Sequence, residues 1–243
     1  MFRSRYKVCE LFDIPIFIES SFIFLLILFT LDMGSFSMGL SVALVLAISV
    51  TAHELAHALT ARLFGYRTND ITLSLLGGCA SLIALPRKAW QEFLTALAGP
   101  LMSFAIAGAS FVVLSLGVIS SHYLCFVLYS GYLMNLMLGG FNLLPGFPMD
   151  GGRIFRSLMR AFVSRPKATL VAMWVGRVFA VLLGLKGLWS MINGGGFGFI
   201  TLMIAWMIWK EGWREYQLAL TEENFRNWSQ ADFNARVSPP PYD

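Results

Sequence analysis

The sequence predicts an all-α polytopic membrane protein of about six transmembrane helices, with a β-hairpin between the second and the third. Hydrophobic residues make up 57% of its 243 residues and charged residues only 13%, whereas about a quarter of the residues in soluble domains are charged. Six apolar segments each approach the roughly 20 residues that a membrane-spanning helix needs. They cover residues 14–31, 39–64, 93–119, 123–144, 169–192 and 197–213.

Lysine and arginine residues fall on one side of these segments. They precede the first segment and follow the second, the fourth and the sixth, whereas the loops around Asp32, at 120–122 and at 193–196 contain neither. The positive-inside rule therefore predicts a multi-pass protein of the cell membrane with both termini in the cytosol. This distribution explains the net charge of +4 without a nucleic-acid partner. We expect a six-span domain over residues 1–213 and a short cytosolic tail over 214–243.

The second apolar segment contains the motif His53-Glu54-Leu55-Ala56-His57. Residues four apart share one face of a helix, so both imidazoles can reach one metal ion while Glu54 holds the water that the metal polarises. Two of the three histidines in the chain lie in this motif. The alternative is a structural polar cluster, but such groups are costly in hydrocarbon unless they meet a partner. The motif therefore predicts a metal site with Glu54 as its catalytic residue.

A third protein ligand is needed, because catalytic zinc sites use three ligands and a water. The candidates near membrane depth are Glu19, Glu92, Asp150 and, on the opposite side, His122. Asp150 stands out because prolines and glycines interrupt the chain just before it. Irregular backbone at that depth is tolerated only when it is buried in protein or lines a water-filled cavity. The alternative is that Asp150 caps a helix that starts near Gly151.

The spacing of apolar residues changes between the second and third apolar segments. Apolar residues at 71, 73 and 75 alternate with Thr72 and Ser74, a pattern that predicts a strand. Gly77-Gly78 is then interpreted as the two-residue turn of a hairpin. An edge strand of this hairpin could bind an extended peptide by main-chain hydrogen bonds. The alternative is a short cytosolic hairpin without a binding role.

Three motifs in this order resemble the site-2 protease family of intramembrane zinc metalloproteases. They are His53-Glu54-x-x-His57, Ala98-Gly99-Pro100, and Asn142-x-x-Pro145 followed by Asp150-Gly151. The similarity extends over about residues 13–177. It implies that His53, His57 and Asp150 hold one zinc ion per chain and that Glu54 is the general base. Asn142 matches an asparagine that would bind substrate near the metal.

The resemblance also implies a membrane-associated hairpin beside the active site, with Gly77 and Gly78 as candidate substrate-binding residues. The expected substrate is a membrane protein in its lipid surroundings, cleaved within or next to a transmembrane segment in regulated intramembrane proteolysis. The oligomeric state stays open. The sequence departs from the family at Glu19, where many relatives have histidine; that residue is not a primary ligand, so the catalytic assignment is unaffected.

A membrane metal-ion transporter that uses the same ligands is the alternative function. A transporter would not need Glu54 as a base. Internal repeats, which are common in transporter folds, are not visible in this sequence. The sequence therefore favours the protease.

Overall fold

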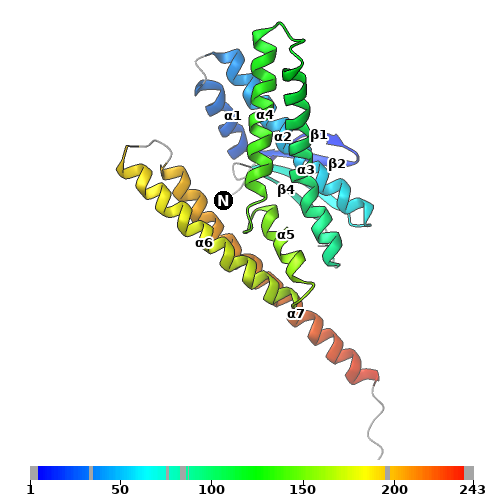
Figure 1. Ribbon diagram of the computed structural model, residues 1–243. Coiled ribbons are helices and arrows are strands. Elements are labelled where there is room, and N and C mark those ends of the chain that lie inside the picture. The colour runs from blue at the N-terminus through cyan, green and yellow to red at the C-terminus, as the bar shows by residue number, and fades with distance from the viewer. Residues whose placement is uncertain are drawn as a thin grey trace, which may run out of the picture. The chain divides into compact units, whose positions relative to one another are not determined.

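The computed structural model describes residues 5–32, 35–74, 77–82, 86, 88–194 and 198–237, and the chain divides into two compact units, residues 1–143 and 144–243. In the N-terminal unit the elements are β1 (Arg5–Leu11), β2 (Ile14–Glu19), α1 (Ser20–Asp32), α2 (Phe36–Leu63), β3 (Thr68–Ser74), β4 (Gly77–Leu82), α3 (Ala89–Ser115) and α4 (His122–Asn142). The C-terminal unit contains α5 (Asp150–Met159), α6 (Arg165–Ile192) and α7 (Gly198–Val237) (Figure 1).

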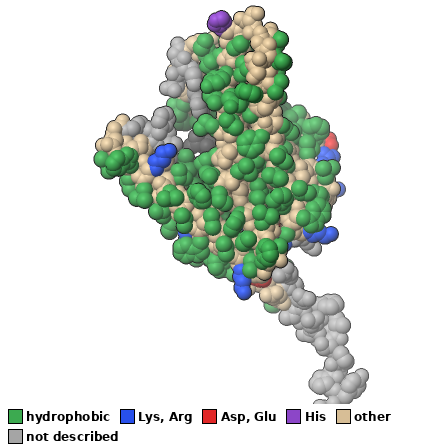
Figure 2. Space-filling view, in the orientation of Figure 1, with side chains coloured by type: hydrophobic (Ala, Val, Ile, Leu, Met, Phe, Trp, Pro, Cys, Tyr) green, Lys and Arg blue, Asp and Glu red, His purple; other side chains and the backbone are tan. Residues whose placement is uncertain are grey.

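Four of the described helices, α2, α3, α4 and α6, are long and apolar enough to cross a membrane. They correspond to the second to fifth apolar segments of the sequence. The first segment is different, because residues 14–19 form strand β2 and only 13 residues remain for α1. Helix α7 begins near the expected sixth segment but continues beyond residue 213 to Val237. Hydrophobic side chains cover much of the face shown in Figure 2, as expected for helices solvated by lipid.

The strands form one four-stranded sheet in the order β1-β2-β3-β4. β1 and β2 pair antiparallel, β2 and β3 pair parallel, and β3 and β4 pair antiparallel. The sequence predicted only the last two strands. β1 and β2 were missed because the apolar residues of β2 run without a break into α1 and resemble the start of a span. Their connection is a two-residue turn at Phe12 and Asp13, which have φ of 52° and 62°, and these residues lack the Asn-Gly or Asp-Gly signature of such turns.

The predicted turn at Gly77-Gly78 is wrong. Both glycines belong to β4, where Gly77 pairs with Ser74 and Gly78 pairs with Leu73. Residues 75 and 76, which connect the two strands, lie outside the described residues. A glycine within a strand often marks a close approach by another group rather than a turn, and at Gly78 that group is a side chain of α2.

The core of the N-terminal unit lies between the sheet and the helices α1 and α2. Ile71 and Leu73 of β3 are fully buried, in agreement with the alternation that predicted this strand. They pack in one cluster with side chains of β2, α1 and α2: Ile14, Ile16, Phe22, Val50 and Ala58. Because Ala58 directly follows His57 on α2, this packing fixes one face of the helix against the sheet and leaves its histidines on another.

Helix α2 ends as its sequence predicted, near Gly65. The residue adopts φ of +85°, a conformation that glycine reaches without strain. The backbone N–H of Tyr66 donates to the carbonyl of Ala61 at 3.0 Å, and that of Gly65 donates to Arg62 at 2.9 Å. These two bonds form a Schellman motif, which satisfies carbonyls at the helix end and turns the chain into β3.

In the C-terminal unit, α6 and α7 pack side by side in opposite directions. A Cβ on Gly187 would lie 2.9 Å from the carbonyl of Gly198 near one end of the pair, and a Cβ on Gly212 would lie 3.2 Å from Met173 near the other. Small residues at these points let the two backbones approach closely. The pairing also joins α7 to the segment around α5, because the buried Arg156 of α5 forms an ion pair with Glu215 of α7 at 2.8 Å.

Candidate metal centre

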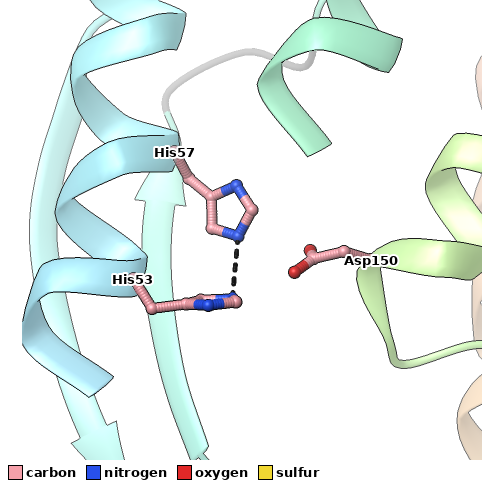
Figure 3. A group of neighbouring side chains, drawn as sticks. All are labelled: His53, His57 and Asp150. Atoms are coloured by element: carbon pink, nitrogen blue, oxygen red, sulfur yellow. Dashed lines mark hydrogen bonds between the residues drawn. The ribbon is translucent and has the colours of Figure 1, made fainter. Parts of the chain in front are cut away.

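His53 and His57 lie one turn apart on α2, and both side chains are buried. Their Nε2 atoms face one another at 3.2 Å (Figure 3). Two nitrogens that bind one tetrahedral zinc ion at about 2.0–2.1 Å lie roughly 3.3–3.4 Å apart. The two rings therefore already have a separation suited to a shared ion, as the four-residue spacing predicted.

Helix α3 orients both rings through their other nitrogen atoms. Nδ1 of His57 lies 2.6 Å from the main-chain oxygen of Thr95. A carbonyl can only accept, so Nδ1 of His57 donates this hydrogen bond and its Nε2 is the nitrogen that faces His53. Nδ1 of His53 lies 2.9 Å from Oγ of Ser103, which is fully buried. Such outer partners hold imidazole ligands in the tautomer that binds a metal.

Gly99 of α3 keeps open the space in front of the two Nε2 atoms. A Cβ at this position would lie 2.6 Å from Nε2 of His53 and even closer to Nε2 of His57. Any other residue would therefore place carbon where an ion shared by the two imidazoles would lie. The sequence indicated this glycine only through the family motif Ala98-Gly99-Pro100, and the structure supplies its physical reason.

Glu54 lies beside the histidines on α2 and is half-buried. Its carboxyl group packs against the backbone of β4, because a Cβ on Gly78 would lie 2.8 Å from both Cδ and Oε1 of Glu54. The glycine thus gives the carboxylate its room. Among the sequence-predicted site residues, the N-terminal unit brings together His53, Glu54, His57 and Gly78, whereas the surroundings of Gly77 are not among those described.

Asp150 is the first residue of α5 and is buried. The N-cap of this helix is Met149, so the alternative in which Asp150 occupies the capping position does not hold. A carboxylate in the first turn is favoured by the helix dipole. Figure 3 draws Asp150 together with the two histidines.

The other three candidates for a third ligand have different surroundings. His122 begins α4 beside Tyr123, whose hydroxyl bonds to Ser41, and Ser41 lies twelve residues before His53 on α2, about 18 Å along the helix. Glu19 ends β2 and accepts a hydrogen bond from Ser21 at 3.3 Å. Glu92 is buried in the first turn of α3. None of these three belongs to the metal-binding group found among the described residues.

Helix α4 carries two asparagines whose side-chain amides donate hydrogen bonds. Asn142, the predicted substrate-binding residue, is the last residue of the helix, and its Nδ2 donates to Leu138 at 3.0 Å. Asn135, which sequence reasoning missed, is fully buried and donates to Ser49 of α2 at 2.8 Å. Ser49 lies one turn before His53, so this bond fixes α4 to the helix that carries the histidines. An amide inside an apolar segment was the signal that could have found it.

The donor set suits zinc. The described residues contain a group of two histidines and one aspartate, all buried, that could hold a metal ion. Imidazole nitrogen and carboxylate oxygen are zinc ligands, and three protein ligands leave the fourth position of a catalytic site open for water.

The chain resembles known proteins over most of its length. A family model described as "Peptidase family M50" matches residues 41–121 and 117–185. A zinc metalloprotease of Methanocaldococcus jannaschii is 32% identical over 91% of this chain and 63% of its own length. The stage IV sporulation protein FB of Bacillus subtilis is 32% identical over 58% of this chain and 48% of its own. The chain spans about half to two thirds of the length of the curated relatives that it matches.

A solved structure also matches. The structure of a site-2 protease from Methanocaldococcus jannaschii superimposes with a TM-score of 0.66 and 30% sequence identity. The match covers 88% of this chain and 95% of that one. The likeness to that structure therefore extends over most of this chain.

Proposed function

This chain belongs to peptidase family M50, the site-2 protease family, and from that premise we propose that it is an intramembrane zinc metalloprotease. It would hydrolyse a peptide bond within or next to a transmembrane segment of a membrane protein. The observation that carries the proposal is the pair of buried imidazoles, whose Nε2 atoms lie 3.2 Å apart beside a glutamate on the same helix. Such a pair with an adjacent carboxylate suits metal-assisted hydrolysis.

One zinc ion per chain would be held by His53, His57 and Asp150. Each offers one ligand atom and each is buried. Two further features support the assignment: α3 fixes the outer nitrogens of both imidazoles, and Gly99 leaves room for an ion. When bound, zinc supplies a water of lowered pKa and polarises the scissile carbonyl.

Glu54 would take a proton from the attacking water and deliver it to the leaving nitrogen. Its packing against Gly78 supports this role, because a carboxylate held by the backbone of β4 cannot swing freely. Asn142 would bind the substrate near the scissile bond, and Gly77 and Gly78 would lie on the substrate path. Among the described strands, β4 is at an edge of the sheet, so an unwound substrate segment could pair with its main chain.

The finer topology follows from the charge distribution. Six spans with both termini in the cytosol would place α1 and the first part of α7 in the cell membrane beside the four candidate spans. Residues 1–213 would form the protease domain, and residues 214–243 a cytosolic tail. The hairpin of β3 and β4 would lie at the membrane beside Glu54. Membrane lipid and transmembrane protein substrates are the expected partners.

The test compares two changes in α2. Full-length wild type, Glu54→Gln and the double variant His53→Ala/His57→Ala are purified, and zinc is counted by mass spectrometry. Cells that lack the protein are complemented with each form, and membrane proteomics then detects transmembrane fragments that accumulate. Glu54→Gln should keep about one zinc per chain and accumulate uncleaved fragments, whereas the double variant should lose the metal.

Two outcomes would contradict the proposal. Undiminished zinc in the double variant would remove both histidines from the metal site. Normal fragment clearance by Glu54→Gln would exclude the glutamate as base and, together with zinc uptake into vesicles by the same variant, would favour the transporter.

A further inference from the structure

Arg177 lies inside α6, one of the candidate membrane spans, twelve residues after Arg165 and fifteen before Ile192. A charged side chain at such a position is costly and usually meets an opposite charge, a backbone carbonyl or a polar cavity. No carboxylate of the described residues forms an ion pair with Arg177, although carboxylates of α7 pair with arginines elsewhere in this unit. The structure therefore leaves the positive charge of Arg177 without an anion from the described part of the chain.

Three indole rings surround the guanidinium group of Arg177. Its central carbon lies 4.9 Å from the ring centre of Trp174 on α6. It lies 4.5 Å from that of Trp209 and 5.6 Å from that of Trp213, both on α7. Cation–π contacts of this kind stabilise the charge and fix its plane, but a ring face accepts few of the five N–H bonds that a guanidinium can donate. The buried Nε of Arg177 has no hydrogen-bond partner among the residues that the structure describes.

The aromatic cluster is on the outside of the C-terminal unit. The exposed fractions of Trp174, Trp209 and Trp213 are 55%, 45% and 48%. In a membrane protein such surfaces meet lipid, and tryptophan prefers the level of the lipid headgroups. The guanidinium is therefore held at a surface where a lipid phosphate can reach it, and the long side chain of arginine allows it to approach that level.

A second cation lies near the same rings. Lys210 of α7 is exposed and stacks on Trp206 at 5.1 Å. On an α-helix, residues 206, 209, 210 and 213 fall within an arc of about 100°, so Lys210 shares a face of α7 with the indoles that contact Arg177. Two cations and several indoles thus occupy one lipid-facing region, here called the Arg177 cluster and defined as Trp174, Arg177, Trp206, Trp209, Lys210 and Trp213.

We propose that the Arg177 cluster binds the phosphate group of an anionic phospholipid. A guanidinium matches two phosphate oxygens at once, and basic sites between membrane helices on the cytosolic side recognise anionic headgroups. The exposed side chains of Val178, Val181 and Leu185 continue along α6 away from the cluster, which gives the acyl chains an apolar surface. A zwitterionic lipid carries its own ammonium group, so it would compete less well.

The test measures lipid retention by the purified full-length protein. Native mass spectrometry counts phosphatidylglycerol and phosphatidylcholine bound when both are supplied at equal concentration. Wild type should retain one phosphatidylglycerol with a preference of roughly tenfold, the size of one hydrogen-bonded charge contact. Arg177→Gln should lose the preference, and Arg177→Lys should keep only part of it because a lysine cannot bind two oxygens in one plane. Lys186→Gln is the matched control, since it removes an exposed charge from the same helix outside the cluster.

Several results would overturn the proposal. Equal retention of the two lipids by wild type would do so without any variant, and therefore does not depend on whether Arg177→Gln folds. Unchanged preference in Arg177→Gln would remove Arg177 from the site, and loss of the preference in Lys186→Gln would make the effect one of net charge. A thermal stabilisation by inorganic phosphate as large as that by phosphatidylglycerol would assign the site to a free anion and refute the lipid.

Discussion

Replacing Gly99 by alanine should remove the metal from the centre while the helix α3 remains intact. In an ordinary helix position this substitution stabilises the protein by about 0.5–1 kcal/mol, because alanine loses less backbone entropy than glycine. At Gly99 the new Cβ would lie 2.6 Å from Nε2 of His53. Uncharged atoms pack at about 3.5 Å or more, so the ring or the helix has to move by roughly 1 Å.

A displacement of this size acts on the metal and on catalysis at once. Zinc ligands have to be within about 0.2 Å of their bonding distances, and a 1 Å misplacement in an active site can cost about 100-fold in rate. We therefore expect Gly99→Ala to bind zinc in less than a tenth of the molecules and to lower kcat/KM by at least about 100-fold. Cleavage of a transmembrane substrate, zinc content and the thermal midpoint are measured on the same preparation.

Gly108→Ala is the matched control in the same helix. A Cβ at Gly108 would meet no atom of the described residues within 4 Å, so this variant should keep its zinc and activity. Its thermal midpoint should stay the same or rise. If Gly99→Ala retained full zinc and wild-type cleavage, the space in front of the two imidazoles would not be the place of the ion, and the geometric reasoning would be refuted.

Two further outcomes follow from close contacts elsewhere. Gly78→Ala should lower kcat by roughly 10- to 100-fold with unchanged zinc content, because the new Cβ displaces the Glu54 carboxylate. An equal kcat in wild type and Gly78→Ala would show that Gly78 does not position the general base. Burial alone would raise the pKa of Glu215, but Arg156 and neighbouring arginines outweigh it and hold that pKa below 4.5. The ion pair therefore stabilises the protein above about pH 4.5 and is lost as pH falls further. Glu215→Gln should lower the free energy of unfolding by about 3 kcal/mol at pH 7 and reduce the dependence of the thermal midpoint on acid pH. Glu211 belongs to an exposed ion pair, so the control variant Glu211→Gln should change neither quantity.

The parts of the site that the sequence predicted are those encoded by local spacing. His53 and His57 are four residues apart, and a helix brings such residues together whatever the rest of the chain does. The alternation at Ile71 and Leu73 likewise predicted a strand with one buried face, and both side chains are buried in β3. Gly65 ended α2 where a left-handed residue was expected.

The missed features depend on contacts between distant segments. The strand order β1-β2-β3-β4 requires a parallel pairing between residues more than fifty positions apart, which no local pattern encodes. The turn assigned to Gly77-Gly78 was wrong because a glycine permits a turn and a close approach equally well, and only the position of Glu54 decides between them. The contacts of Arg177 with Trp209 and Trp213 could not be predicted either, because they form only when α7 packs antiparallel against α6.

The two imidazoles of the proposed metal centre differ in how a substitution elsewhere in the chain can affect them. The partner of His57 is the main-chain oxygen of Thr95, which every amino acid carries, so substitutions at position 95 leave that acceptor in place. The partner of His53 is the hydroxyl of Ser103, and a single base change in the gene can remove it. Drift or directed evolution at this centre would therefore change the basicity of one imidazole, that of His53, while the other stays constant. Metal affinity could be tuned through position 103 without altering any ligand.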